Sequence, residues 1–195
     1  MNEALVVAVA VLWVLVIALV IAVFALARQI GVLYERVAPM GALTIDDGPK
    51  VGDLAPAFNL TALDGKKVQV GAPGAFSTLL FFLSPTCPVC KKLLPVLRSI
   101  AQDEAKWLRV VLASDGDEAK QRSFYEKAAL GEFPYVLSTD LGMAWKVAKL
   151  PYAVLTDEQG RVRAKGLINS REQLESLFTA KELGVGSIQE YLQKA

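Results

Sequence analysis

The pattern of apolar and polar positions changes abruptly near residue 27. Residues 4–27 carry no charged side chain, and every face of a helix built from them would be apolar. At roughly 1.5 Å per residue such a helix is about 36 Å long, which is enough to cross a hydrocarbon core of about 30 Å. The pattern therefore predicts a transmembrane helix over residues 4–27, with the lipid bilayer as its partner.

The same segment could instead be a signal peptide that is removed. Ala25-Leu26-Ala27 fits a cleavage site, but Met1-Asn2-Glu3 has no Lys or Arg, and the apolar run exceeds the usual length of about 7–15 residues. We therefore expect a permanent anchor. Arg28 and Arg36 follow the helix and no basic residue precedes it, so the positive-inside rule alone favours a cytoplasmic C-terminal domain. Long domains cross membranes largely regardless of such charges, and this leaves the orientation open.

After the anchor, a linker over residues 28–50 leads into alternating short strands and amphipathic helices. The pattern predicts strands 58–61 and 67–70 around an Asp64-Gly65 turn, strand 77–83, a helix after Cys87, strand 107–113, helix 117–130, strand 135–138, helix 141–147, strands 152–156 and 161–165, and a helix that starts at the capping box Ser170-Arg-Glu-Gln173 and ends near Gly184. This order predicts an α/β domain over residues 51–184, with a central mixed sheet and helices on both faces. Residues 185–195 form a C-terminal tail.

Composition excludes several kinds of chemistry. The 195 residues include 21 basic and 20 acidic side chains with no basic stripe, which argues against nucleic acid as a partner. The absence of histidine excludes Ser-His-Asp and Cys-His catalysis as well as histidine-ligated zinc and haem. The two cysteines, Cys87 and Cys90, are too few for a closed zinc site. We expect no metal or cofactor, and any chemistry should depend on this cysteine pair.

Cys87-Pro88-Val89-Cys90 is a CxxC motif between a buried strand and a helix. Cys87 would lie at the helix N-terminus, where unpaired N–H groups and the helix dipole stabilise a thiolate. Cys90, one turn later, could attack a mixed disulfide on Cys87 and release the partner. A plain surface disulfide is the alternative, but the strand before and the helix after favour a redox site.

Four segments resemble the TlpA-type thioredoxin-like proteins: residues 51–58 (VGDLAPAF), 63–66 (LDGK), 84–95 (SPTCPVCKKLLP) and 150–160 (LPYAVLTDEQG). Together with the N-terminal helix and residues 181–191, they resemble in particular the membrane-anchored accessory proteins of methylamine utilisation within that family. The resemblance implies a thioredoxin-like fold on the periplasmic face of the inner membrane.

The resemblance also assigns roles to single residues. Cys87 would be the attacking sulfur and Cys90 the resolving one. Pro151, which on its own could be an ordinary loop proline at the start of a strand, would be a cis-proline facing the CxxC motif. Leu150 would offer its backbone to a substrate chain, and Thr86 stands where thioredoxins usually carry an aromatic residue. Thr86, Leu150 and Pro151 are thus the expected substrate-binding residues.

The implied function is a thiol–disulfide oxidoreductase that forms or isomerises disulfides in the small subunit of methylamine dehydrogenase during its maturation. An unidentified redox partner would recharge Cys87–Cys90. Two alternatives stay open: a periplasmic thiol reductase of the cytochrome c maturation type, and a non-catalytic chaperone or scaffold for dehydrogenase assembly. Phe81 and Leu93 stand where relatives carry acidic residues, so the sequence does not explain how Cys90 gains and loses its proton. A peroxidase is disfavoured because Leu80 occupies the position of the proline in the peroxiredoxin motif.

Overall fold

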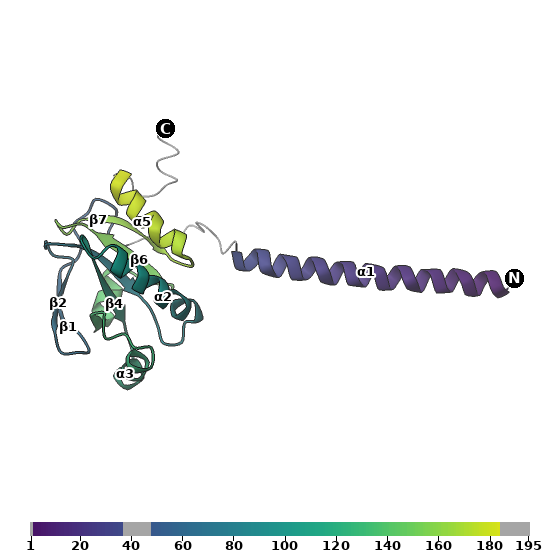
Figure 1. Cartoon of the computed structure of the whole chain (residues 1–195), viewed down its shortest axis with the longest axis horizontal. Helices are drawn as coiled ribbons and strands as arrows, with labels where there is room; N and C mark the ends of the chain where they lie inside the picture. The colour runs from purple at the N-terminus through teal and green to yellow at the C-terminus, as the bar shows by residue number, and fades with distance from the viewer. Residues whose placement is uncertain (1, 37–47, 184–195) are drawn as a thin grey trace. The chain divides into compact units, whose positions relative to one another are not determined.

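The computed structural model describes residues 2–36 and 48–183 (Figure 1). The chain divides into two compact units, Met1–Thr44 and Ile45–Ala195, and each is described here by itself. Most of the predicted linker, residues 37–47, and the predicted tail over residues 185–195 lie outside the described residues.

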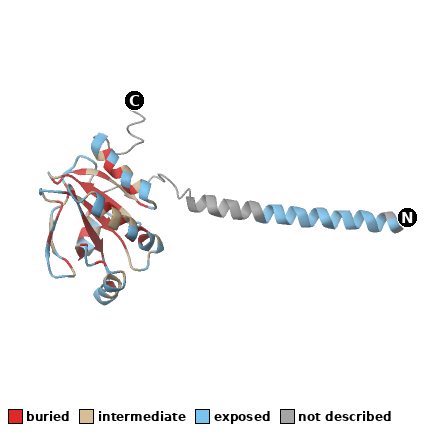
Figure 2. Ribbon diagram, in the orientation of Figure 1, coloured by how far each residue is buried: buried red, intermediate tan, exposed pale blue. Residues whose placement is uncertain are grey.

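The first unit contains helix α1, Asn2–Arg36. Within α1 the span Leu5–Phe24 is long and apolar enough to cross a membrane, and its residues are exposed (Figure 2). The helix continues past the predicted segment 4–27, so the first residues of the predicted linker are helical. A long, uncovered apolar helix of this kind is consistent with a membrane-anchored protein.

The second unit is built on a five-stranded mixed sheet with the order β5-β4-β3-β6-β7. Strands β3, β4 and β5 are parallel to one another, and β6 and β7 are antiparallel to their neighbours. A separate antiparallel hairpin precedes the sheet. The elements are β1 Phe58–Thr61, β2 Lys67–Val70, β3 Ser77–Phe82, α2 Pro88–Asp103, β4 Leu108–Ser114, α3 Glu118–Lys127, β5 Tyr135–Leu137, α4 Thr139–Ala144, β6 Tyr152–Thr156, β7 Val162–Leu167 and α5 Arg171–Leu183. The predicted order of elements and the predicted mixed sheet are confirmed.

Alternate residues of β3 pack into two different apolar clusters, as expected for a strand covered on both faces. Leu79 and Phe81 join the cluster that includes apolar residues of α2 and α5. Leu80 and Phe82 join the cluster formed with α4 and the β1–β2 hairpin. Figure 2 shows the buried residues concentrated along the central strands. The prediction of helices on both faces is confirmed, and the hairpin helps to cover the second face.

Two helices begin or end where the apolar pattern did not predict. Helix α3 ends at Lys127 rather than near residue 130, because Ala129 adopts a left-handed conformation with φ of 49°. Helix α4 spans Thr139–Ala144 rather than residues 141–147. Ser138 caps its N-terminus by accepting a hydrogen bond from the Leu141 N–H (3.1 Å), and Lys146 (φ 49°) follows its end.

The predicted capping box at α5 is present in a shifted form. The Ser170 hydroxyl accepts from the Gln173 N–H (3.4 Å), as predicted. The Gln173 side chain, however, accepts from the Asn169 N–H (2.6 Å) and not from the Ser170 N–H. It therefore satisfies a donor one residue before the one that the motif predicts.

Candidate active site

The CxxC motif lies where β3 ends and α2 begins. Cys87 is the N-cap of α2, with extended backbone angles, and its Sγ accepts a hydrogen bond from the Cys90 N–H (3.1 Å). Pro88 opens the helix, a position at which its missing N–H costs nothing. The first turn contains no acidic side chain. The positive end of the helix dipole therefore points at Cys87 without a competing carboxylate in that turn.

The two cysteines form a disulfide but differ in exposure. Cys87 is half-buried, whereas Cys90 is 0% exposed and belongs to the apolar cluster beneath α2. An attacking sulfur atom from solvent can therefore approach Cys87 and is kept away from Cys90. This asymmetry suits a pair in which one sulfur exchanges with a partner and the other closes the ring.

A short turn holds the approach to Cys87. The Cys87 N–H donates to the Ser84 carbonyl (3.1 Å), and the Thr86 N–H donates to the Ser84 hydroxyl (3.3 Å). The hydroxyl oxygens of Ser84 and Thr86 are 3.0 Å apart. Thr86, predicted as a substrate-binding residue, is exposed at this turn. Ser84 was not predicted to have a role, although a Ser two residues before a Thr is a signal for such a turn.

Leu150 and Pro151 lie at the same end of the sheet as the cysteines. Phe82, the last residue of β3, pairs with Tyr152, the first residue of β6. Pro151 immediately precedes Tyr152. The Leu150–Pro151 bond is cis, as the resemblance implied. Pro151 is buried and its carbonyl accepts from the Ile168 N–H (3.0 Å), while Leu150 is 39% exposed. The fold thus brings the predicted site residues to one end of neighbouring strands.

Phe81 and Leu93 stand at the two positions where the resemblance leads us to expect acidic residues, and both are apolar and buried. Phe81 is 0% exposed and Leu93 is 3% exposed, and both belong to the same apolar cluster as Cys90. Neither residue can donate or accept a proton. The route by which Cys90 gains its proton on reduction is therefore not provided by either of these positions.

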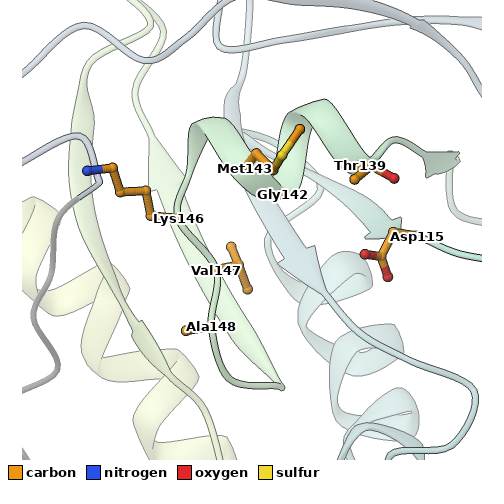
Figure 3. Close-up of a pocket in the computed structure, with 7 residues that line it drawn as sticks. All are labelled: Asp115, Thr139, Gly142, Met143, Lys146, Val147 and Ala148. Carbon is orange, nitrogen blue, oxygen red and sulfur yellow. The ribbon is translucent and has the colours of Figure 1, made fainter.

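A pocket of about 380 Å³ opens at the C-terminal ends of β4 and β5 (Figure 3). Its walls come from three separate connections: the loop after β4, helix α4, and the segment leading to Leu150. The lining residues are Asp115, Thr139, Gly142, Met143, Lys146, Val147 and Ala148. Six of the seven lining residues lie within residues 139–148, and only Asp115 comes from a distant part of the chain.

A buried hydrogen-bond network lies under the same end of the sheet. The Tyr135 hydroxyl donates to the Gln121 side-chain carbonyl, and the Gln121 amide donates to the Ser114 hydroxyl (2.8 Å) and to the Asp115 carbonyl. Burial raises the pKa of Tyr135 to about 12, so the hydroxyl remains protonated and keeps its role as donor. The network fixes the loop after β4 against α3.

Comparison with known proteins agrees with this geometry. The Redoxin family model matches residues 50–180. The chain is 47% identical over 183 residues to the methylamine utilization protein MauD of Methylorubrum extorquens, covering 93% of this chain and 88% of that protein. The chain belongs to the Redoxin family and its MauD group. The MauD protein of Paracoccus denitrificans is similar at 45% identity, over 93% of this chain and 90% of its own length.

Solved structures agree on the fold. A putative thiol:disulfide interchange protein DsbE from Chlorobium tepidum superposes with a TM-score of 0.61 at 22% identity, over 69% of this chain and 99% of that one. The family, the fold and the Cys87–Cys90 disulfide together identify the second unit as a thioredoxin-like thiol–disulfide oxidoreductase domain.

Proposed function

We propose that this protein is a membrane-anchored thiol–disulfide oxidoreductase that forms or isomerises disulfides in the small subunit of methylamine dehydrogenase. The observation that carries the proposal is the disulfide between a half-buried Cys87 at the N-terminus of α2 and a fully buried Cys90. The client class is supported by similarity to relatives named for methylamine utilization. The small subunit itself comes from the resemblance of the sequence to the accessory proteins of that system.

Disulfide formation proceeds in two exchanges. A client thiolate attacks the Cys87 Sγ, the Cys87–Cys90 bond breaks, and Cys90 leaves as a thiolate that takes up a proton. A second client thiolate then attacks the client sulfur of the mixed disulfide, and Cys87 leaves as a thiolate at the positive end of α2. The client loses two electrons and two protons; the cysteine pair gains both electrons, Cys90 takes up one proton, and the other proton is released to solvent while Cys87 stays a thiolate. A redox partner that accepts two electrons must then reoxidise the pair.

Isomerisation uses the reduced pair and needs no net electron transfer. The Cys87 thiolate attacks a client disulfide and releases one client thiolate. That thiolate attacks another disulfide of the client, and a further exchange returns Cys87 to its free form. If the mixed disulfide persists, the Cys90 thiolate attacks the Cys87 Sγ and releases the client as a thiolate. This leaves the client reduced and the cysteine pair oxidised. In either reaction Thr86, Leu150 and Pro151 are proposed to hold the client strand beside Cys87.

For the membrane arrangement we propose residues 4–27 as the anchor and residues 51–184 as a redox domain in the periplasm. Disulfides form and persist in oxidising compartments such as the bacterial periplasm. Together with the resemblance, this outweighs the weak charge bias of Arg28 and Arg36. Cys87 and Cys90 are the only cysteines, so a membrane-impermeant maleimide reports their side. After mild reduction, intact spheroplasts should be labelled. Labelling only after lysis would place the domain in the cytoplasm.

The reduction potential of Cys87–Cys90 in the detergent-solubilised full chain is the experiment that tests the proposed direction. A value between about −120 and −180 mV is typical of oxidants and isomerases and would support disulfide formation or reshuffling. A value of about −270 mV or lower is typical of reductants. In that case the disulfide-forming function would be wrong, and the reductase would replace it.

Cysteine variants separate the enzyme from a scaffold. Cys87→Ser should reduce thiol–disulfide exchange to the uncatalysed rate and block dehydrogenase maturation. Cys90→Ser should accumulate a mixed disulfide between Cys87 and the client, because the resolving sulfur is missing. Normal maturation with Cys87→Ser would contradict a catalytic role and favour the chaperone or scaffold.

A further inference from the structure

Two segments of the chain that border the candidate active site contain basic residues and no acidic residues. Residues 78–102 contain Lys91, Lys92 and Arg98 and no Asp or Glu, and residues 141–156 contain Lys146 and Lys149 and no Asp or Glu. The pairing of Phe82 with Tyr152 brings these two segments together at the end of the sheet that carries Cys87. Arg98 pairs with Glu132, and the remaining basic residues of these segments are the lysines of the first turns of α2 and those before Pro151.

Lys91 and Lys149 are placed closest to the proposed chemistry. Lys91 follows Cys87 by one helical turn, its N–H donates to the Cys87 carbonyl (3.3 Å), and residues four apart lie on the same helix face. Lys149 lies two residues before Pro151, beside the exposed Leu150. Both lysines are exposed, and within residues 48–183 neither takes part in an ion pair. Both ammonium groups are therefore accessible to a partner from solvent.

Among the described residues, several acidic side chains follow β4 and β5, and Glu172 lies in the first turn of α5, four residues after Ile168, whose N–H donates to the Pro151 carbonyl. Asp117 caps α3 by accepting from the Lys120 N–H (2.9 Å), and Glu118 pairs with Arg122 (2.8 Å). Asp115 lines the pocket, and Asp140 lies in the first turn of α4. The first turns of α2 and the segment before β6 thus carry lysines without carboxylates of their own, while carboxylates follow β4 and β5 and lie in the first turn of α5.

We propose that Lys91 and Lys149 recognise acidic residues flanking the client cysteine, so that the preferred substrate is an extended, acidic polypeptide segment. This inference rests on the proposed function. Two lysines on either side of an extended strand would pair with carboxylates that precede and follow the reacting cysteine. Anionic lipid headgroups could also attract lysines. The position of both residues beside Cys87 and Leu150, where a client strand must lie, favours a polypeptide.

The test uses the oxidised full chain in neutral detergent and three reduced peptides. Each peptide carries the same pair of cysteines, flanked by Glu, by Gln or by Lys. We expect the Glu peptide to be oxidised at least about tenfold faster than the Lys peptide at low salt, since rim charges act mainly on association rates. The ratio should approach one at about 0.5 M salt, where the Debye length is only a few ångströms.

Variants assign the preference to the two lysines. Lys91→Gln and Lys149→Gln should each lower the Glu-to-Lys rate ratio, and the double variant should lower it further. Lys106→Gln is the matched control, because Lys106 is an exposed lysine between α2 and β4, at the other end of the sheet. Its ratio should equal that of the unmodified protein. A ratio that the double variant leaves unchanged overturns the proposal.

Other outcomes separate this inference from the function on which it rests. Equal oxidation of all three peptides overturns the acidic preference and leaves the oxidoreductase intact. If the protein reduces oxidised peptides instead, the same ratio is expected in that direction, because the docking surface is the same. Absence of exchange in both directions overturns the proposed function and this inference with it. If the double variant loses binding to phosphatidylglycerol vesicles and keeps its peptide ratio, the lysines bind lipid and the proposal is wrong.

Discussion

The two ends of the five-stranded sheet differ in what their lysines contact: at one end a lysine bonds to a serine and a glutamate, and at the other end two exposed lysines lie near a disulfide. The first end holds Ser77, at the start of β3, and Glu158, after β6. The buried Ser77 hydroxyl donates to the Glu158 carboxylate (2.6 Å), and Lys181 of α5 donates to both. The Lys181 ammonium also lies 4.5 Å from the centre of the Trp107 ring. This end joins α5 to two strands.

The other end holds Cys87, Leu150, Lys91 and Lys149. Its side chains contact solvent, and one of its most exposed apolar residues, Met143 (62% exposed), lines the pocket. The contrast indicates a division of labour within one sheet. Lys181 stabilises the packing of α5 on the sheet, whereas Lys91 and Lys149 are exposed, take part in no ion pair within residues 48–183, and can meet a partner.

The largest expected difference between the two ends concerns glycines with positive φ. Gly160 (φ 74°) lies in the turn after β6, and a Cβ there would be 2.8 Å from the Gly71 carbonyl oxygen. Gly116 (φ 93°) lies in the loop after β4, and a Cβ there would meet nothing within 4 Å. Gly160→Ala should lower the free energy of unfolding by about 2–4 kcal/mol, through strain and a backbone clash together. Gly116→Ala should lower it by only about 1 kcal/mol, through strain alone.

Urea denaturation of both variants measures this difference. The turn at Gly160 is also held by the buried Asp157, whose carboxylate accepts from the Gln159 N–H (3.0 Å) and the Arg161 N–H (2.8 Å). The turn therefore has little freedom to relax around a new methyl group. Equal losses in the two variants would mean that the Gly160 turn adapts, and that this end is no more rigid than the other.

Much of the fold could be predicted from the sequence because the signals are local. Strand Tyr152–Thr156 and the hairpin over residues 58–70 were predicted at their observed positions, from apolar runs and the Asp64-Gly65 turn. The ends of α3 and α4 were not, because Ala129 and Lys146 have positive φ without being glycines. At Ala129 a tertiary contact accompanies the turn: Arg98, from α2, donates to the Ala128 and Ala129 carbonyls.

The residues of the candidate site also differ in how far the sequence alone predicts them. Cys87 and Cys90 are neighbours in sequence, so spacing and the adjacent strand and helix were enough to select them. Pro151 is far from them in the chain and was selected only through the resemblance. The Ser77–Glu158–Lys181 group was not predicted at all, because its members are 81 and 23 residues apart and carry no shared motif. Long-range polar contacts of this kind depend on the finished fold.

A matched pair of lysine substitutions sharpens the comparison. Lys181→Met keeps the length of the side chain but leaves the buried Ser77 hydroxyl and Glu158 without their cation. The free energy of unfolding should fall by about 1–3 kcal/mol, with no change in the rate of peptide oxidation. Lys149→Met should change the free energy of unfolding by no more than about 0.5 kcal/mol, since Lys149 is exposed. It should instead slow oxidation of acidic peptides.

Both variants are assayed by urea denaturation and by peptide oxidation on the same preparations. We expect Lys181→Met to change only the free energy of unfolding and Lys149→Met to change only the rate of peptide oxidation. If Lys181→Met also slowed oxidation substantially at a pH and temperature where it is folded, the two ends would be coupled through the sheet.

The smallest expected effect is the pH dependence contributed by Glu158. Its hydrogen bond from Ser77, followed by its contact with Lys181, lowers the pKa of Glu158 from 4.5 to about 2. Because the folded-state pKa is the lower one, the carboxylate stabilises the fold above pH 4.5 and loses this contribution as the pH falls from 4.5 through 2. The side chain is 35% exposed, so water and salt screen part of the interaction.

Unfolding by urea at a series of pH values should show the unmodified protein losing more stability over this range than Glu158→Gln. Glu126→Gln, at an exposed position of α3, should follow the unmodified protein. If the Glu158→Gln and unmodified curves ran parallel from pH 7 to pH 2, the carboxylate would not be stabilised by Ser77 and Lys181, and the polar cluster at this end would contribute through the Lys181 contact with Trp107 instead.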